Sequence, residues 1–167
     1  MPRSTIEPGP PAQACIGLGA NLGDARAALE AALHALAELS GTTLRATSPI
    51  YRSAPIDSTG PDYLNAVALL DTVLLPHDLL AALQGIEAAH GRERPYRNAP
   101  RTLDLDLLTY GDQIIQTPTL TLPHPRLHER AFVLVPLAQI APEMAIPGRG
   151  LVRDLLEGVT GQRIDRL

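Results

Sequence analysis

Residues 103–107 alternate leucine and aspartate, and this alternation constrains the fold more than any other feature of the sequence. Successive side chains of a β-strand point to opposite faces of a sheet, so Asp104 and Asp106 share one face and the leucines take the other. The two carboxylates lie roughly 7 Å apart along the strand, given a rise of about 3.3 Å per residue. Such a pair can hold one or two hard cations that take their remaining ligands from water and phosphate oxygens. Ordinary acids on a solvated strand face are the alternative.

Strand and helix signals along the chain come in the order strand, helix, strand, strand, helix, strand. Short apolar or β-prone runs that end at Gly, Pro or polar residues indicate strands, and leucines at helical spacing indicate helices. These rules predict strands over residues 14–19, 42–52, 63–73 and the aspartate pair, and helices over residues 24–39 and 76–90. This order predicts an α+β fold of the ferredoxin-like type, a βαββαβ core whose antiparallel sheet carries helices on one face.

C-terminal additions follow this predicted core. We expect a hairpin turn over residues 110–113, an extended segment over 120–125 and a third helix over 132–140. A length of 167 residues with 45% apolar composition suits one domain, which we place at residues 14–167. Residues 1–13, rich in Pro, Gly and polar side chains, predict a loose N-terminal leader. Residues on the uncovered face of the sheet and in the loops are then left to bind a ligand.

The overall composition excludes several classes of partner. A formal net charge of -4 argues against a nucleic acid held mainly by a basic surface. Apolar runs are too short to cross a bilayer, so we expect a soluble cytoplasmic protein without a membrane partner. The single cysteine, Cys15, excludes an internal disulfide and fits a buried position in the first strand. We expect the protein to be a monomer.

Positive charge gathers between the second helix and the aspartate pair, at Arg92, Arg94, Arg97 and Arg101. Surface ion pairs, each worth about 0 to 1 kcal/mol, would explain these residues without a function. Phosphoryl transfer offers a second explanation, because metal ions and arginines together neutralise the charge that develops on the moving phosphates. A loop histidine, His124, is held between two prolines that fix the backbone on either side. It is either exposed to water or placed reproducibly at a site.

Aromatic residues are scarce, with one Phe and four Tyr in the chain. Phe132 and Tyr63 are core residues by default. Alternatively, they sandwich a flat heterocycle whose edge Asn65, on the same strand face as Tyr63, recognises by hydrogen bonds. The glycines at 17, 19 and 23 are spaced G-x-G-x-x-x-G and do not match the dinucleotide-binding pattern. The sequence also lacks a G-x-x-x-x-G-K-[ST] loop, which excludes a P-loop kinase.

Five segments together resemble the 6-hydroxymethyl-7,8-dihydropterin pyrophosphokinase family of folate biosynthesis. They are residues 16–23 (IGLGANLG), 51–56 (YRSAPI), 62–66 (DYLNA), 100–106 (PRTLDLD) and 122–126 (LPHPR). The resemblance runs from about residue 14 to residue 144, and the PRTLDLD string is its most specific part. It implies a ferredoxin-like enzyme that transfers diphosphate from ATP to the hydroxymethyl group of 6-hydroxymethyl-7,8-dihydropterin and releases AMP.

The resemblance also implies a role for individual residues. Two Mg²⁺ ions would be held by Asp104 and Asp106, with ATP as co-substrate. Transfer would be assisted by Arg92 and Arg101. The nucleotide site would be formed by Gln84, Arg94, Leu107, Thr121, His124 and Arg130. The pterin site would be formed by Ser53, Ala54, Ile56, Tyr63, Asn65 and Phe132.

Two other functions compete with this interpretation. Ferredoxin-like domains often bind a small ligand without chemistry, so a non-catalytic small-ligand-binding module is the main alternative. A pure binding module has no need for paired aspartates beside arginines. An RNA-binding ferredoxin-like domain is the second alternative, and it would require exposed aromatic residues on a basic surface. The acidic net charge and the scarcity of aromatic residues disfavour it.

Overall fold

A six-stranded antiparallel sheet organises the computed structural model, which describes residues 10–21, 24–54, 62–90 and 103–167. Its strands are β1 (Ala12–Ala20), β2 (Thr42–Thr47), β3 (Tyr51–Ser53), β4 (Tyr63–Thr72), β5 (Asp104–Tyr110) and β10 (Ile164–Arg166). The central strand β1 pairs with β4 on one side and with β5 on the other. Strand β4 also pairs with β2 and with β3. Strand β10 pairs with β3 and extends the sheet beyond it. This arrangement confirms the predicted ferredoxin-like core.

The strand predicted over residues 42–52 is split into β2 and β3. The Ser48 N–H donates to the carbonyl of Val67, and Ser48 Oγ accepts from the Val67 N–H at 2.9 Å. Pro49 follows and has no N–H to contribute to a ladder. The interruption therefore arises from one proline, with a serine side chain taking the place of a backbone partner.

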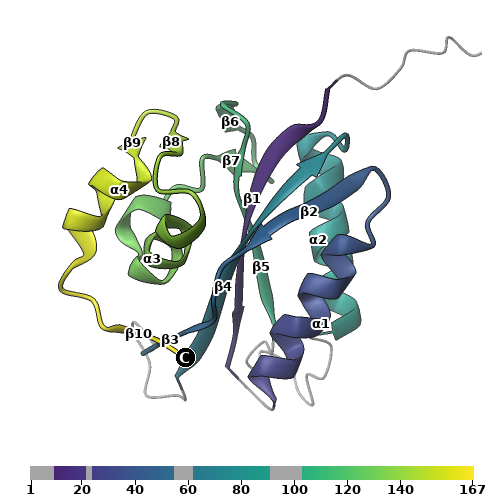
Figure 1. Ribbon diagram of the computed structural model, residues 1–167. Coiled ribbons are helices and arrows are strands. Elements are labelled where there is room, and N and C mark those ends of the chain that lie inside the picture. The colour runs from purple at the N-terminus through teal and green to yellow at the C-terminus, as the bar shows by residue number, and fades with distance from the viewer. Residues whose placement is uncertain (1–9, 22–23, 55–61, 91–102) are drawn as a thin grey trace, which may run out of the picture.

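Two helices, α1 (Ala25–Ala37) and α2 (Pro76–His90), cover one face of the sheet, as predicted (Figure 1). Asp24 caps α1, because its side chain accepts from the Ala27 N–H at 3.0 Å. The leucines of both helices pack against alternate residues of the strands in one buried cluster that includes Ile16, Leu18, Leu29, Leu36, Leu79, Leu83, Leu105 and Leu107. The leucines that alternate with the two aspartates therefore face this core, and the aspartates face the opposite side of the sheet.

The opposite face of the sheet is only half open, which corrects the expectation of an uncovered face. Helix α3 (Ala131–Ile140) and α4 (Val152–Leu155) pack there, on the other side of the sheet from α1 and α2 (Figure 1). Their apolar residues form a second buried cluster with sheet residues Cys15, Val67, Leu69 and Leu108. The short element η1 (Leu127–Glu129) precedes α3, the strands β8 (Ala145–Ile146) and β9 (Gly150–Leu151) lie between α3 and α4 in the chain, and η2 (Leu156–Val159) follows α4.

Most predicted boundaries hold to within two residues. Strand β1 begins at Ala12, inside the predicted leader, because Ala12 pairs with Thr72 and Gln13 with Asp71. The predicted turn after β5 is confirmed by Gly111, which has a φ of +55°, and it leads into the hairpin of β6 (Ile115–Gln116) and β7 (Thr121–Leu122). Cys15 is buried in β1, as predicted, and burial raises the pKa of its thiol. Within the described residues, every helix is too short or too polar to span a bilayer.

Candidate active site

A cavity of about 240 Å³ opens on the part of the second sheet face that α3 and α4 leave free. Strands β1, β3, β4 and β5 and the start of α3 all contribute to its lining. The cavity brings together eight residues that the sequence singled out, namely Ser53, Ala54, Tyr63, Asn65, Asp104, Asp106, Arg130 and Phe132. These residues come from four separate stretches of sequence, so their convergence is a property of the fold.

The floor of the cavity is a row of paired residues across three strands. Gly19 on β1 pairs with Asp104 on one side and with Asn65 on the other, and Gly17 pairs with Asp106. Paired residues of an antiparallel sheet point to the same face, and neighbouring strands lie about 4.8 Å apart. The carboxylate and the amide therefore stand on strands roughly 10 Å apart, with a glycine between them. A Cβ at Gly19 would lie 3.3 Å from Asn65 Nδ2, a tight contact, so a larger residue here would crowd the amide.

Asn65 is held in one orientation by Ser53. The Ser53 hydroxyl donates to Asn65 Oδ1 at 2.5 Å, and both residues are buried. This hydrogen bond fixes which side of the amide carries the oxygen, and so it fixes where the NH₂ group can donate to a ligand. A buried donor of this kind strongly favours a ligand that presents an acceptor at its edge.

The start of α3 supplies an aromatic ring and a cation. Arg130 precedes the helix, and its guanidinium lies over the ring of Phe132 at 5.3 Å from the ring centroid. Such a contact stabilises the pair by cation–π attraction. Both side chains line the cavity and are half-buried. The ring can stack on a flat ligand while the guanidinium meets negative charge.

His124 is anchored beside the acidic strand. Its backbone N–H donates to the carbonyl of Leu108 at 2.8 Å, and its ring Nδ1 accepts from the Arg126 N–H at 3.2 Å. Partial burial lowers the pKa of the imidazole; Asp106 opposes this shift, and Arg130 and Arg126 add to it. The ring is therefore neutral at neutral pH, with its proton on Nε2, where it can donate to a phosphate oxygen.

The lowered pKa of His124 makes the protein less stable in acid. In the unfolded chain the pKa of a histidine is about 6.5, so as the pH falls the unfolded state binds this proton before the folded state does. The neutral imidazole of His124 therefore makes its full contribution to the free energy of unfolding above about pH 6.5. This contribution is lost as the pH falls from there through the lower pKa of the folded state. We expect the melting temperature of the wild type to fall more steeply between about pH 7 and pH 5 than that of His124→Asn. Asparagine keeps an acceptor for the Arg126 N–H and does not titrate, and parallel curves would contradict the expectation.

The cavity lining does not include four of the described site residues: Gln84, Leu107, Thr121 and His124. Gln84 is exposed on α2 and Thr121 is exposed on β7. The side chain of Leu107 is buried in the core against α1 and α2, so only its backbone can reach a ligand. Arg92, Arg94, Arg101 and Ile56 lie outside the described residues. Their roles stay predictions.

Two features of the site were missed from the sequence. Gly17 and Gly19 form the floor, a role that neither their G-x-G-x-x-x-G spacing nor the resemblance of residues 16–23 to the family had indicated. Alternation along the first strand could have placed them on one face, opposite Ile16 and Leu18. Glu87 of α2 is the second feature, because its carboxylate accepts from the Leu105 N–H at 2.9 Å. This contact ties α2 to the strand that carries the aspartates.

The donor set suits magnesium. Asp104 is half-buried and Asp106 is exposed, both on the face that the cavity opens onto. Among the described residues, no group of three or more His, Cys, Asp or Glu side chains is placed to enclose a metal ion. Mg²⁺ typically binds one or two carboxylates and takes its remaining ligands from water and substrate phosphates. Two carboxylates beside an open cavity therefore fit this ion.

Curated relatives resemble the chain over nearly its whole length. A protein of Pseudomonas aeruginosa is 45% identical over 153 residues, which cover 91% of this chain and 94% of the relative. A protein of Haemophilus influenzae is 44% identical over 155 residues, which cover 92% of this chain and 97% of the relative. Both are named 2-amino-4-hydroxy-6-hydroxymethyldihydropteridine pyrophosphokinase.

Solved structures support the fold. The wild-type HPPK-DHPS of Plasmodium falciparum with SDX-DHP superposes with a TM-score of 0.70 at 15% identity. The match covers 88% of this chain and 44% of that longer chain. The model of the 7,8-dihydro-6-hydroxymethylpterin-pyrophosphokinase (HPPK) family matches residues 15–142. From this match and the curated relatives, the chain belongs to the HPPK family of pyrophosphokinases.

Proposed function

We propose that this enzyme transfers a diphosphate group from ATP to the hydroxymethyl group of 6-hydroxymethyl-7,8-dihydropterin and releases AMP, as a step of folate biosynthesis. One observation carries this proposal: a pair of aspartates and an oriented amide face each other across a glycine floor within one cavity. The amide suits a flat heterocycle rich in hydrogen-bonding groups, and the aspartates suit metal-bound phosphates.

The pterin ring lies on the glycine floor in this proposal. Phe132 and Tyr63 contact its two faces, and the amide NH₂ of Asn65 donates to its edge. Ser53 fixes the amide, and Ala54 lines the same wall. Ile56, outside the described residues, is a further proposed pterin contact. This orientation directs the hydroxymethyl group toward Asp104 and Asp106, because they stand at the opposite end of the floor.

The nucleotide lies between the acidic strand and the histidine segment. Asp104 and Asp106 would hold two magnesium ions, which when bound neutralise charge on the phosphate oxygens. His124 donates from Nε2 to a phosphate oxygen in this proposal, and Arg130, at the start of α3, adds positive charge. Gln84, Thr121, Arg94 and the backbone of Leu107 complete the nucleotide site in this proposal.

Transfer proceeds by in-line displacement. The pterin hydroxyl oxygen attacks the β-phosphorus and its proton is released to solvent, while the bond from that phosphorus to the oxygen bridging to the α-phosphate breaks and AMP leaves with the electron pair. The protein contributes mainly position and charge, because phosphoryl transfer demands little covalent chemistry from the enzyme. Arg92 and Arg101 are the proposed sources of further positive charge, and Asp104 is the candidate for orienting the hydroxyl proton.

Product analysis tests the proposal. Incubation with ATP, magnesium and 6-hydroxymethyl-7,8-dihydropterin should yield AMP and the pterin diphosphate in equal amounts. ADP in place of AMP would indicate simple phosphoryl transfer and contradict the proposal. Binding of the pterin with no turnover of ATP would support the non-catalytic small-ligand-binding module instead. Omission of magnesium should abolish AMP release, because the two aspartates then have no cation through which to hold the phosphates.

The oligomeric state, the partners and the cellular location of the enzyme are proposed from its sequence. We propose that the enzyme acts as a monomer on these two small molecules, without a nucleic-acid or membrane partner, in the cytoplasm. The net charge of -4 supports the exclusion of a nucleic-acid partner.

A further inference from the structure

Helix α3 begins without a cap of its own. Arg130 occupies the N-cap position and makes no side-chain capping hydrogen bond. A residue distant in sequence takes over this role: Gln162 Oε1 accepts from the Ala131 N–H at 2.9 Å. The same amide donates from Nε2 to the carbonyl of Glu129 at 2.7 Å. One side chain therefore fixes the backbone on both sides of Arg130, and it satisfies a helix N–H that otherwise has no intrahelical partner.

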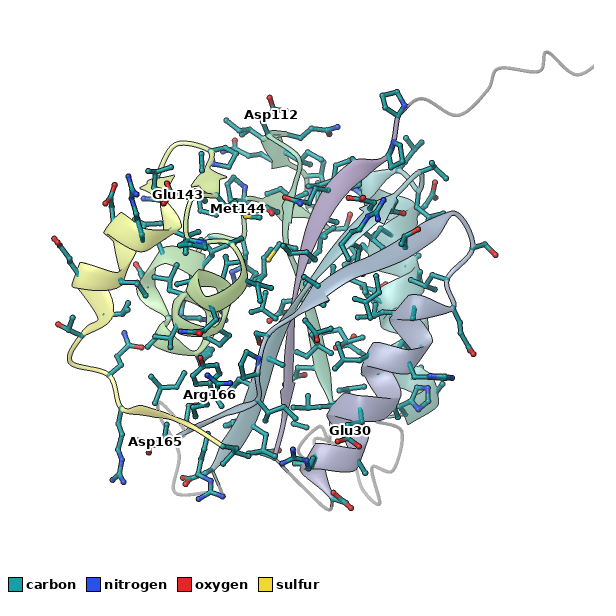
Figure 2. All side chains as sticks on the ribbon, viewed as in Figure 1. Glu30, Asp112, Glu143, Met144, Asp165 and Arg166 are labelled. Carbon is teal, nitrogen blue, oxygen red and sulfur yellow. The ribbon has the colours of Figure 1, made fainter. Side chains whose placement is uncertain are left out.

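The segment that carries Gln162 also anchors the opposite wall of the cavity. It continues into β10, which pairs with β3 so that Ile164 lies opposite Ser53. Asp165 and Arg166 of this strand lie at the lower left of Figure 2, at the end of the sheet where β3 lies. The Leu167 N–H adds a hydrogen bond to the carbonyl of Ile50 at 3.0 Å. Residues 162–166, which we call the C-terminal clamp, thus contact β3 and the start of α3 together.

A second hollow lies between the start of α3 and the C-terminal clamp. A groove of about 590 Å³ lies next to the cavity, and Ser53, Ala54, Arg130 and Phe132 line both. Gln162 and Arg163 line only the groove. The first turn of α3 is packed on its core side, where Ala131, Val133 and Leu134 are buried, but Phe132 is only half-buried and faces both hollows. The hydrogen bonds of Gln162 add to this packing a direct restraint on the backbone on both sides of Arg130.

We infer that Gln162 is a positioning residue for the reaction, and that the C-terminal clamp sets the distance between the Phe132 ring and the Ser53–Asn65 wall. This inference rests on the proposed position of the pterin between these two walls. Gln162 touches neither substrate in this arrangement and acts only through the residues that do. Pre-organised walls bind a flat ligand more tightly because less order is lost on binding.

Replacing the amide with a side chain of similar size tests the inference. For Gln162→Leu we expect KM for the pterin to rise about tenfold while kcat falls less than about threefold. Gln139→Leu is the matched control, since Gln139 is exposed on the same helix, and it should leave both constants unchanged. Gln162→Glu keeps an acceptor for the Ala131 N–H but loses the donor to Glu129, so it should recover part of the pterin affinity. A melting curve for each variant separates positioning from general loss of stability.

A double substitution identifies the route of the effect. If Gln162 acts through Phe132, then Gln162→Leu should add less than about twofold to the pterin KM in a Phe132→Ala background. If Gln162→Leu raises the pterin KM by the same factor in the Phe132→Ala background as in the wild type, the inference is overturned. A Gln162→Leu variant with a lower melting temperature but an unchanged pterin KM would also overturn it. An unchanged pterin KM in Phe132→Ala alone would instead refute the proposed pterin position. The two failures are therefore distinguishable.

Discussion

Removing either carboxylate of the pair should nearly abolish turnover. For Asp104→Ala and Asp106→Ala we expect kcat to fall roughly a thousandfold or more, because each change removes a ligand for the cations that hold the migrating phosphates. The fold should persist, since Asp106 is exposed and Asp104 is only half-buried. AMP release at saturating ATP, pterin and magnesium measures the effect.

Asp112→Ala is the matched control for this pair. Asp112 is an exposed aspartate in the turn just after β5, and it lies at the top of Figure 2, at the far end of the molecule from β3 and β10. Its removal changes the net charge by the same amount and should leave turnover within about twofold of the wild type. Ordinary turnover in either Asp104→Ala or Asp106→Ala, with the folded state verified by its melting curve, would remove the metal-binding role.

Local alternation predicted the faces of the acidic strand correctly. Leu105 and Leu107 are buried against α1 and α2, and the aspartates lie on the other face. Alternation does not predict register between strands. The pairing of Gly17 with Asp106 and of Gly19 with Asp104 depends on an irregularity between Cys15 and Ile16. A one-residue shift changes which residues are opposite, so the floor of the site required the three-dimensional structure.

Sequence patterns did not predict that α3 covers part of the second face of the sheet. Residues 131–140 are almost wholly apolar, and an apolar helix without a polar face does not indicate which layer it joins. The helix packs on Cys15, Val67, Leu69 and Leu108, which are brought together from three strands. The sequence therefore predicted the helix but not its position, and this position defines the edge of the cavity.

Sequence patterns also did not predict the side-chain contacts between residues that are far apart in the chain. Gln162 lies 31 residues from Ala131, in a polar segment that carries no motif. Ser53 and Asn65 were both placed at the pterin from family resemblance, but the hydrogen bond that orients the amide follows from the pairing of β3 with β4. Residue types at a site can be inferred from a motif, whereas their orientation depends on partners that the fold supplies.

Replacing the oriented amide should reduce selection of the pterin. For Asn65→Leu, a substitution of similar volume, we expect kcat/KM for the pterin to fall roughly a thousandfold, because a site built around a hydrogen-bond donor loses most of its affinity when that donor is removed. The KM for ATP should stay within about threefold, since the nucleotide lies toward Asp104 and Asp106 in the proposed site. Ser53→Ala keeps the amide but removes its partner, so it should cost only about tenfold. Equilibrium titration of each folded variant with the pterin measures affinity directly, and a wild-type dissociation constant for Asn65→Leu would show that the pterin binds elsewhere.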